Sequence, residues 1–74
     1  MNGRILAVRA DITHIIGQKH VRASDAEIVE EFKERLRYAG ANWTKREKRR
    51  IIALALAEHH RNQRLYADVM GGLL

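Results

Sequence analysis

The chain contains no cysteine. Disulfides and thiolate metal sites are therefore excluded, and its 74 residues must be held by packing alone. A chain of this length buries only about 60% of the surface that its unfolded form exposes. Small domains without such links commonly gain stability from idealised helix packing or from association. We therefore expect a single domain over residues 1–74 that forms a homo-oligomer, and the lack of cysteine fits a reducing cytoplasm.

Long hydrophobic runs are also missing. A membrane-spanning helix needs about 18 or more consecutive apolar residues, and no stretch approaches that length. Near the N-terminus, Arg9 and Asp11 interrupt the apolar run that a signal peptide would require. These absences predict a soluble protein located in the cytoplasm, with no membrane partner.

Glycine and proline are absent between Arg46 and Leu65. The same stretch is rich in strong helix formers, and Thr44 and Glu47 have the spacing of a capping box at its start. We therefore predict one long helix over 43–70, ended by Gly71-Gly72.

Two shorter helices are expected before it. The first, over 4–17, is predicted by apolar residues at helical spacing, namely Ile5, Val8, Ile12 and Ile15, and Gly17 is expected to end it. The second, over 24–39, starts at a capping box of Ser24 and Glu27, and Gly40 is expected to end it. The short turn that follows should make a helical hairpin with the third helix, so the fold class is all-α with three helices.

One side of the long helix is predicted to be buried. Residues 51–57 are apolar on every side, which two short companion helices cannot cover. We therefore expect a dimeric bundle in which the long helix supplies both core and dimer contacts, through Ile51, Ile52, Leu54, Leu56, Leu65, Val69 and Met70.

The opposite side of the long helix is basic. The chain has a net charge of +5, and its segments 1–23, 24–41 and 42–74 carry 4 − 1 = +3, 3 − 5 = −2 and 7 − 3 = +4. On the long helix the gaps between arginines are filled by Ala53, Ala57 and His60 and not by acids, whereas a merely solvated face usually mixes signs. This pattern favours binding to nucleic-acid phosphates through Lys45, Arg46, Arg49, Arg50, Arg61 and Arg64, with Lys48 nearby.

Other interpretations stay open. The charges can be an ordinary solvated face, and the protein can be an oligomerisation module with no ligand. It can also be a small adaptor or inhibitor that docks on an acidic surface of another protein and blocks its activity. A helix-turn-helix does not fit, because a turn at Gly40 would place Arg46 and Arg49 where that motif needs apolar residues.

Catalysis and metal binding find little support. No pair of the four histidines has the i,i+4 spacing of a helical zinc site, and there is no glycine-rich phosphate loop. We therefore expect neither an enzyme nor a cofactor nor a metal. The sequence leaves open the partner's identity, any base preference and the exact oligomeric state.

Overall fold

The computed structural model describes residues 3–38 and 42–73, and within these ranges every regular element is a helix. They are α1 (Gly3–Gly17), α2 (Asp25–Tyr38) and α3 (Lys45–Leu73). The predicted all-α class is confirmed, and the first two helices begin and end within one residue of the prediction. Among the described residues, no helix is both long and apolar enough to cross a membrane.

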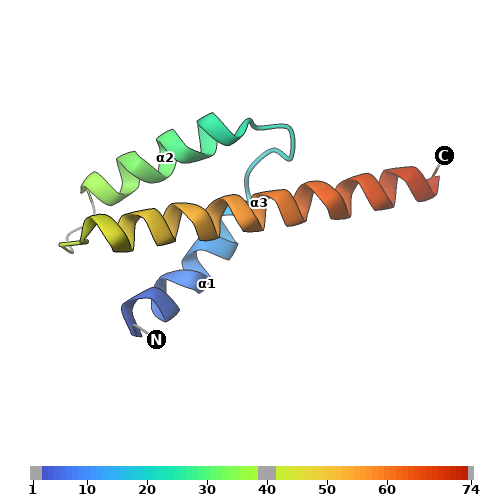
Figure 1. The fold of residues 1–74 in the computed structure, drawn as a ribbon. Helices are drawn as coiled ribbons and strands as arrows, with labels where there is room; N and C mark the ends of the chain where they lie inside the picture. The colour runs from blue at the N-terminus through green and yellow to red at the C-terminus, as the bar shows by residue number, and fades with distance from the viewer. Residues whose placement is uncertain (1–2, 39–41, 74) are drawn as a thin grey trace.

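The long helix α3 sets the shape of the molecule. Its 29 residues should span about 43 Å, which accounts for most of the 47 Å length of the longest axis. In Figure 1, α2 lies along the first half of α3, α1 crosses on another side, and the C-terminal part of α3 projects alone. The radius of gyration is 13.6 Å, against about 11 Å for a compact domain of this length, because of that projection.

The predicted capping box is complete at the start of α3, whereas at the start of α2 only its Ser24 half is present among the described residues. The backbone N–H of Glu27 donates to Ser24 Oγ at 3.2 Å. At α3 the box is reciprocal: the N–H of Glu47 donates to Thr44 Oγ1 at 3.1 Å, and the N–H of Thr44 donates to Glu47 Oε1 at 3.0 Å. These bonds satisfy amides that a helix start leaves unpaired, and so they fix where α2 and α3 begin.

The end of α3 differs from the prediction. Gly71-Gly72 was expected to break the helix, but α3 continues to Leu73. No described glycine has a positive φ, so Gly71 keeps the helical conformation of its neighbours. A glycine costs a helix about 1 kcal/mol relative to alanine, which weakens the helix locally without forcing it to stop.

Gly17 does end α1, as predicted, but by another route. Instead of a left-handed glycine, the chain makes a tight turn in which the N–H groups of Gln18 and Lys19 donate to the carbonyls of Ile15 and Ile16 at 3.2 and 3.0 Å. The predicted role of Gly40 lies outside the described residues.

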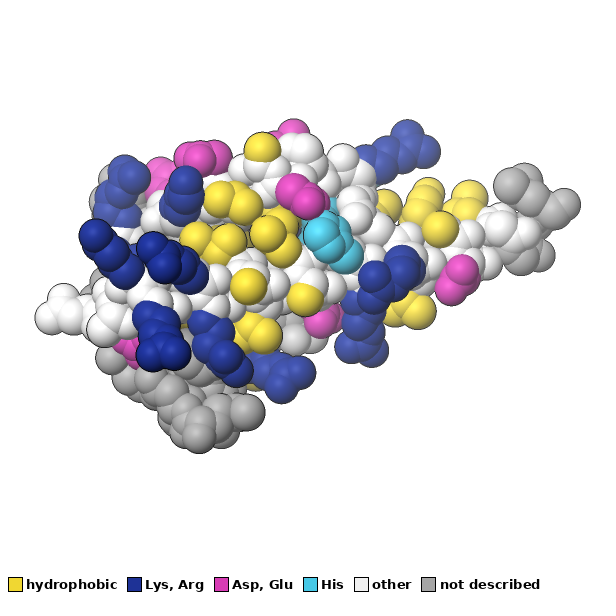
Figure 2. All heavy atoms as spheres, viewed as in Figure 1, with side chains coloured by type: hydrophobic (Ala, Val, Ile, Leu, Met, Phe, Trp, Pro, Cys, Tyr) yellow, Lys and Arg dark blue, Asp and Glu magenta, His cyan; other side chains and the backbone are white. Residues whose placement is uncertain are grey.

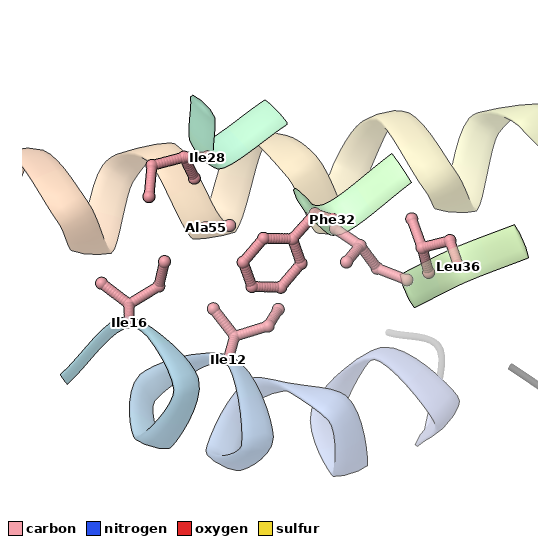
Figure 3. Packing of buried hydrophobic residues seen from close by; sticks show 7 residues of the cluster. Ile12, Ile16, Ile28, Phe32, Leu36 and Ala55 are labelled. Atoms are coloured by element: carbon pink, nitrogen blue, oxygen red, sulfur yellow. The ribbon is translucent and has the colours of Figure 1, made fainter. Parts of the chain in front are cut away.

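The core is a small cluster in which α1 and α2 both pack on α3. In Figure 3, Ile12 points from α1 toward the ring of Phe32, and Ile16 points from α1 toward Ile28 and Ala55. The buried members of the cluster are Ile12, Ile16, Ile28, Phe32, Leu36, Ile51 and Ala55. The predicted core positions Ile52, Leu54 and Leu56 are partly buried against this cluster.

Beyond this cluster the predicted core face is not covered within the single chain. Leu65, Val69 and Met70, which were assigned to core or dimer contacts, are exposed by 52%, 62% and 41%. Ala53 and Ala57 are exposed as well, so the apolar stretch 51–57 is not buried on every side in one copy. For Leu65, Val69 and Met70 the reason is length, because α2 has 14 residues and cannot reach along all of α3. Ala53 and Ala57 instead lie on the side of α3 opposite the buried Ile51.

The connection between α1 and α2 is fastened to α3 by polar side chains. His59 Nε2 donates to the carbonyl of Ala23 at 2.7 Å, and Gln63 Nε2 donates to the carbonyl of Val21 at 2.7 Å. One residue after the buried His59, His60 Nε2 pairs with the Asp25 carboxylate at 2.9 Å. These contacts hold the connection over α3 and thereby set where α2 starts.

Candidate nucleic-acid interface

Basic side chains from two helices meet where α2 ends and α3 begins. On α2, Lys33 and Arg37 are four residues apart and so share one face. On α3, Lys45, Lys48 and Arg49 are related by three and four residues and also share a face. Because α2 packs beside the first half of α3, these two faces border the same hollow.

This hollow, which we call the basic groove, has a volume of about 580 Å³. Its lining contains five lysine and arginine side chains and no acidic one. The full lining is Lys33, Leu36, Arg37, Asn42, Trp43, Lys45, Lys48, Arg49 and Ile52. Figure 2 shows this end of the molecule crowded with basic side chains, next to hydrophobic ones.

Few of the described acidic groups lie near the cations of the basic groove. Glu30 lies close to one groove cation, with its carboxylate 3.7 Å from Lys33 Nζ, but both side chains are more than half exposed. No described carboxylate lies within 4.0 Å of the charged groups of Arg37, Lys45 or Lys48. The groove therefore keeps a positive field that attracts anions.

One acidic residue of α2 that could oppose this field, Glu31, is paired with cations outside the lining of the groove. Glu31 pairs with Arg35, four residues later on the same helix, at 3.1 Å, and it also contacts Lys19. Partial burial alone would raise the pKa of Glu31, but the hydrogen bonds from Lys19 and Arg35 outweigh burial and lower the pKa below its ordinary value of 4.5. Glu31 therefore pairs with the connection between α1 and α2 and with its own helix, and it does not line the groove.

The six predicted binding residues do not form one uniform row. Lys45 and Arg49 line the groove, whereas Arg46 and Arg50 are exposed on the adjoining outer face of α3. Arg61 lies twelve residues after Arg49, about 18 Å farther along the helix. Figure 2 shows these farther basic side chains as a separate, smaller group.

The farther group is partly paired with acids. Arg61 Nη1 lies 4.0 Å from Glu58 Oε2, and His60, between the two groups, is paired with Asp25. Arg64 is exposed on the projecting part of α3. The expectation that the whole row lacks acidic partners is therefore wrong for His60 and Arg61.

Sequence reasoning missed Lys33 and Arg37, because the segment that holds them, 24–41, carries a net charge of 3 − 5 = −2. The available signal was their i,i+4 spacing, which places both cations on one face of α2. Only the packing of α2 beside the start of α3 shows that they add to Lys45 and Arg49.

Trp43 forms one wall of the groove and is half-buried. It packs against the core cluster, so this residue just before the cap at Thr44 has a structural role. Among the described residues, no group of three or more histidine, cysteine, aspartate or glutamate side chains is placed to hold a metal ion.

A comparison of the chain with protein-family models, with curated proteins and with solved structures finds no match. What the groove can bind is therefore inferred from its chemistry alone.

Proposed function

We propose that this protein binds nucleic acid through the sugar-phosphate backbone, with the basic groove as the principal contact. The observation that carries the proposal is the meeting of five cationic side chains from α2 and α3 around one hollow with no acid in its lining. Guanidinium and ammonium groups form strong charge-assisted hydrogen bonds with phosphate oxygens. The role would be architectural or regulatory.

The outer face of α3 extends this contact. Arg49 belongs to the groove, and Arg46 and Arg50 continue from it around the first two turns of the helix. A longer nucleic acid that runs along α3 toward its C-terminal end would also contact Arg61 and Arg64. Contacts of this kind fix the position of a nucleic acid but do not read its bases, so we expect weak sequence preference.

We further propose that the helical hairpin of α2 and α3 carries the binding surface and that the binding unit is a homodimer. Support for the dimer comes from the size of the core, since seven hydrophobic residues are buried among the side chains that the structure describes. It also comes from the apolar side chains that one copy leaves uncovered on α3.

A second candidate function is an adaptor or inhibitor that docks on an acidic surface of another protein. The floor of the groove favours it, because Leu36, Trp43 and Ile52 offer apolar contacts that a phosphate backbone does not need. The two candidates differ in their response to salt. Phosphate binding weakens steeply as salt rises, whereas a protein contact with an apolar centre is weakened less.

The test is binding of a fluorescent duplex of mixed sequence across a salt series. We expect Arg37→Gln with Lys48→Gln to weaken binding by at least about tenfold. The slope of log K against log salt should fall by about 2, because each removed cation leaves one phosphate with its counterion. A matched control removes two charges elsewhere, with Arg9→Gln and Arg22→Gln on exposed sites away from the groove.

Two results would overturn the proposal. One is no binding of the native protein even at low salt, which would turn attention to a protein target. The other is an equal loss of affinity in the groove and control variants, which would mean that only net charge matters. Replacing Arg46 and Arg50 in the same way ranks the outer face of α3 against the groove.

A further inference from the structure

The projecting end of α3 carries an exposed apolar stripe. Leu65, Tyr66, Val69 and Met70 are exposed by 52%, 44%, 62% and 41%. Figures 1 and 2 show this end extending past α1 and α2, with hydrophobic side chains on its surface. These four residues are the large exposed hydrophobic residues of the described chain, and all of them lie within two turns of one helix.

The stripe continues the face of α3 that is buried nearer its start. At 100° per residue, Leu65 and Val69 follow Ile51 and Ala55 along the same side, with Asn62 between them. In the first half of α3 that side is covered by α1 and α2. Beyond Gln63, the last residue that contacts the α1–α2 connection, no described residue covers it.

An uncovered stripe of this kind is unfavourable in a single copy. Helical segments of about ten residues are marginal in water, and most of their stability in proteins comes from packing an apolar face. Monomeric proteins rarely leave large contiguous apolar patches uncovered. Yet residues 64–73 are helical and carry most of their large apolar side chains on one side.

We propose that a second copy of this chain covers the stripe, with the two α3 ends packed antiparallel. The inference supplies the contact for the homodimer proposed above, and it does not depend on nucleic-acid binding. Orientation follows from sterics: because α1 and α2 cover the same face nearer the start of α3, a parallel partner would run into them. An antiparallel partner instead extends beyond the C-terminal end, where this face is open (Figure 1).

The stripe is complementary to itself in this arrangement. When residues 62–73 of two helices overlap about a two-fold axis near residue 67, Leu65 of each copy lies beside Val69 of the other, and the two Tyr66 rings approach the axis. The two Asp68 carboxylates approach the axis on the other edge, each one turn from Arg64 of its own chain. Repulsion between these two carboxylates opposes association, and Asp68→Asn should therefore strengthen the dimer.

The overlap is short, about 18 Å of helix. Such a contact is at the small end of specific interfaces, and we expect a dissociation constant in the micromolar range. The dimer would hold its two basic grooves about 60 Å apart along one axis, since each groove lies near Lys48 and the axis near residue 67. A long nucleic acid could then engage both grooves at once, with a gain from bivalency.

Sedimentation velocity across a concentration series tests the association. The native protein should shift from monomer to dimer, and Leu65→Glu with Val69→Glu should remain monomeric at every concentration. A matched control places two glutamates on the same end but off the stripe, with Ala67→Glu and Gly71→Glu, where an added side chain at Gly71 meets nothing within 4 Å. Circular dichroism confirms that all variants fold, because every substituted residue is exposed.

A native protein that stays monomeric, or a stripe variant that dimerises as well as the control, would overturn the proposal. Orientation is tested separately by spin labels on Ala53→Cys, since the chain has no cysteine of its own and Ala53 is exposed. Antiparallel overlap places the two labels about 40 Å apart, whereas parallel packing places them within about 25 Å. A short distance would rule out the antiparallel arrangement.

Discussion

His59 Nε2 lies 2.7 Å from the carbonyl oxygen of Ala23, thirty-six residues earlier in the chain. A carbonyl only accepts, so this nitrogen carries the hydrogen and donates it. Gln63 Nε2 lies 3.3 Å from the same nitrogen, but both atoms carry hydrogens and this contact is not a hydrogen bond. Gln63 instead donates to the carbonyl of Val21. The imidazole is 1% exposed and is the buried polar group that joins α3 to the α1–α2 connection.

His59→Ala should destabilise the protein by about 2–3 kcal/mol. The substitution leaves the Ala23 carbonyl without its donor in a buried place and opens a cavity beside the core. Urea unfolding followed by circular dichroism measures the loss of stability. The control is His60→Ala: its contact with the Asp25 carboxylate is largely exposed, so we expect a change within about 1 kcal/mol. Equal destabilisation of the two variants would contradict a special role for the buried histidine.

Glu31→Gln should remove a stabilisation that depends on pH. Because the pKa of Glu31 is lowered in the folded protein, the folded state binds this proton less tightly than the unfolded chain does. The stabilisation is therefore complete above the ordinary pKa of 4.5 and is lost as the pH falls through the lowered value. We expect the native protein to be more stable than the variant at pH 7, by less than about 1 kcal/mol because the pair is partly exposed.

The difference in unfolding free energy between the native protein and the Glu31→Gln variant should disappear in acid. Glu34→Gln, a change at an exposed glutamate of the same helix, provides the control and should show no such closing. A Glu31 variant that stays less stable than the native protein by the same amount at pH 3 and pH 7 would show that packing, and not charge, is responsible.

The helix boundaries could be predicted because local signals set them. Ser24 with Glu27 and Thr44 with Glu47 satisfy the first amides of α2 and α3 from within four residues, so no knowledge of the fold was needed. The end of α3 was predicted wrongly for the same reason. A glycine pair is only a local preference of about 1 kcal/mol per residue, and continued helical hydrogen bonding overcomes it.

The arrangement of the helices could not be read in the same way. Lys33 and Arg37 join the basic groove because the face of α2 that carries them borders the start of α3, and the apolar periodicity of the sequence does not fix which charged face lies there. His59 was treated as one of four unremarkable histidines, although its position on the apolar face, one turn after Ala55, was a signal that it is buried. Its partner, a backbone carbonyl in a loop, has no signature in the sequence.

Gly71→Ala should lengthen the time that the end of α3 spends as a helix. Alanine removes the glycine penalty of about 1 kcal/mol, and the added methyl group meets nothing within 4 Å. Hydrogen exchange should show greater protection for the amides of residues 66–73, with little change in the core. Ala67→Gly, at an exposed site one turn earlier, should have the opposite effect. If neither substitution changes the exchange, this end is not helical in solution.

Trp43 gives a direct optical test of where a nucleic acid binds. It is the one tryptophan of the chain, and it forms a wall of the basic groove together with Lys45 and Lys48. A duplex seated in the groove displaces water and brings phosphates and bases beside the indole, so titration should change its emission. High salt should reverse the change, because phosphate binding weakens as salt rises. Binding to the outer face of α3 at Arg46 and Arg50 alone would leave the emission unchanged, and anisotropy that rises without any change at Trp43 would therefore place the duplex outside the groove.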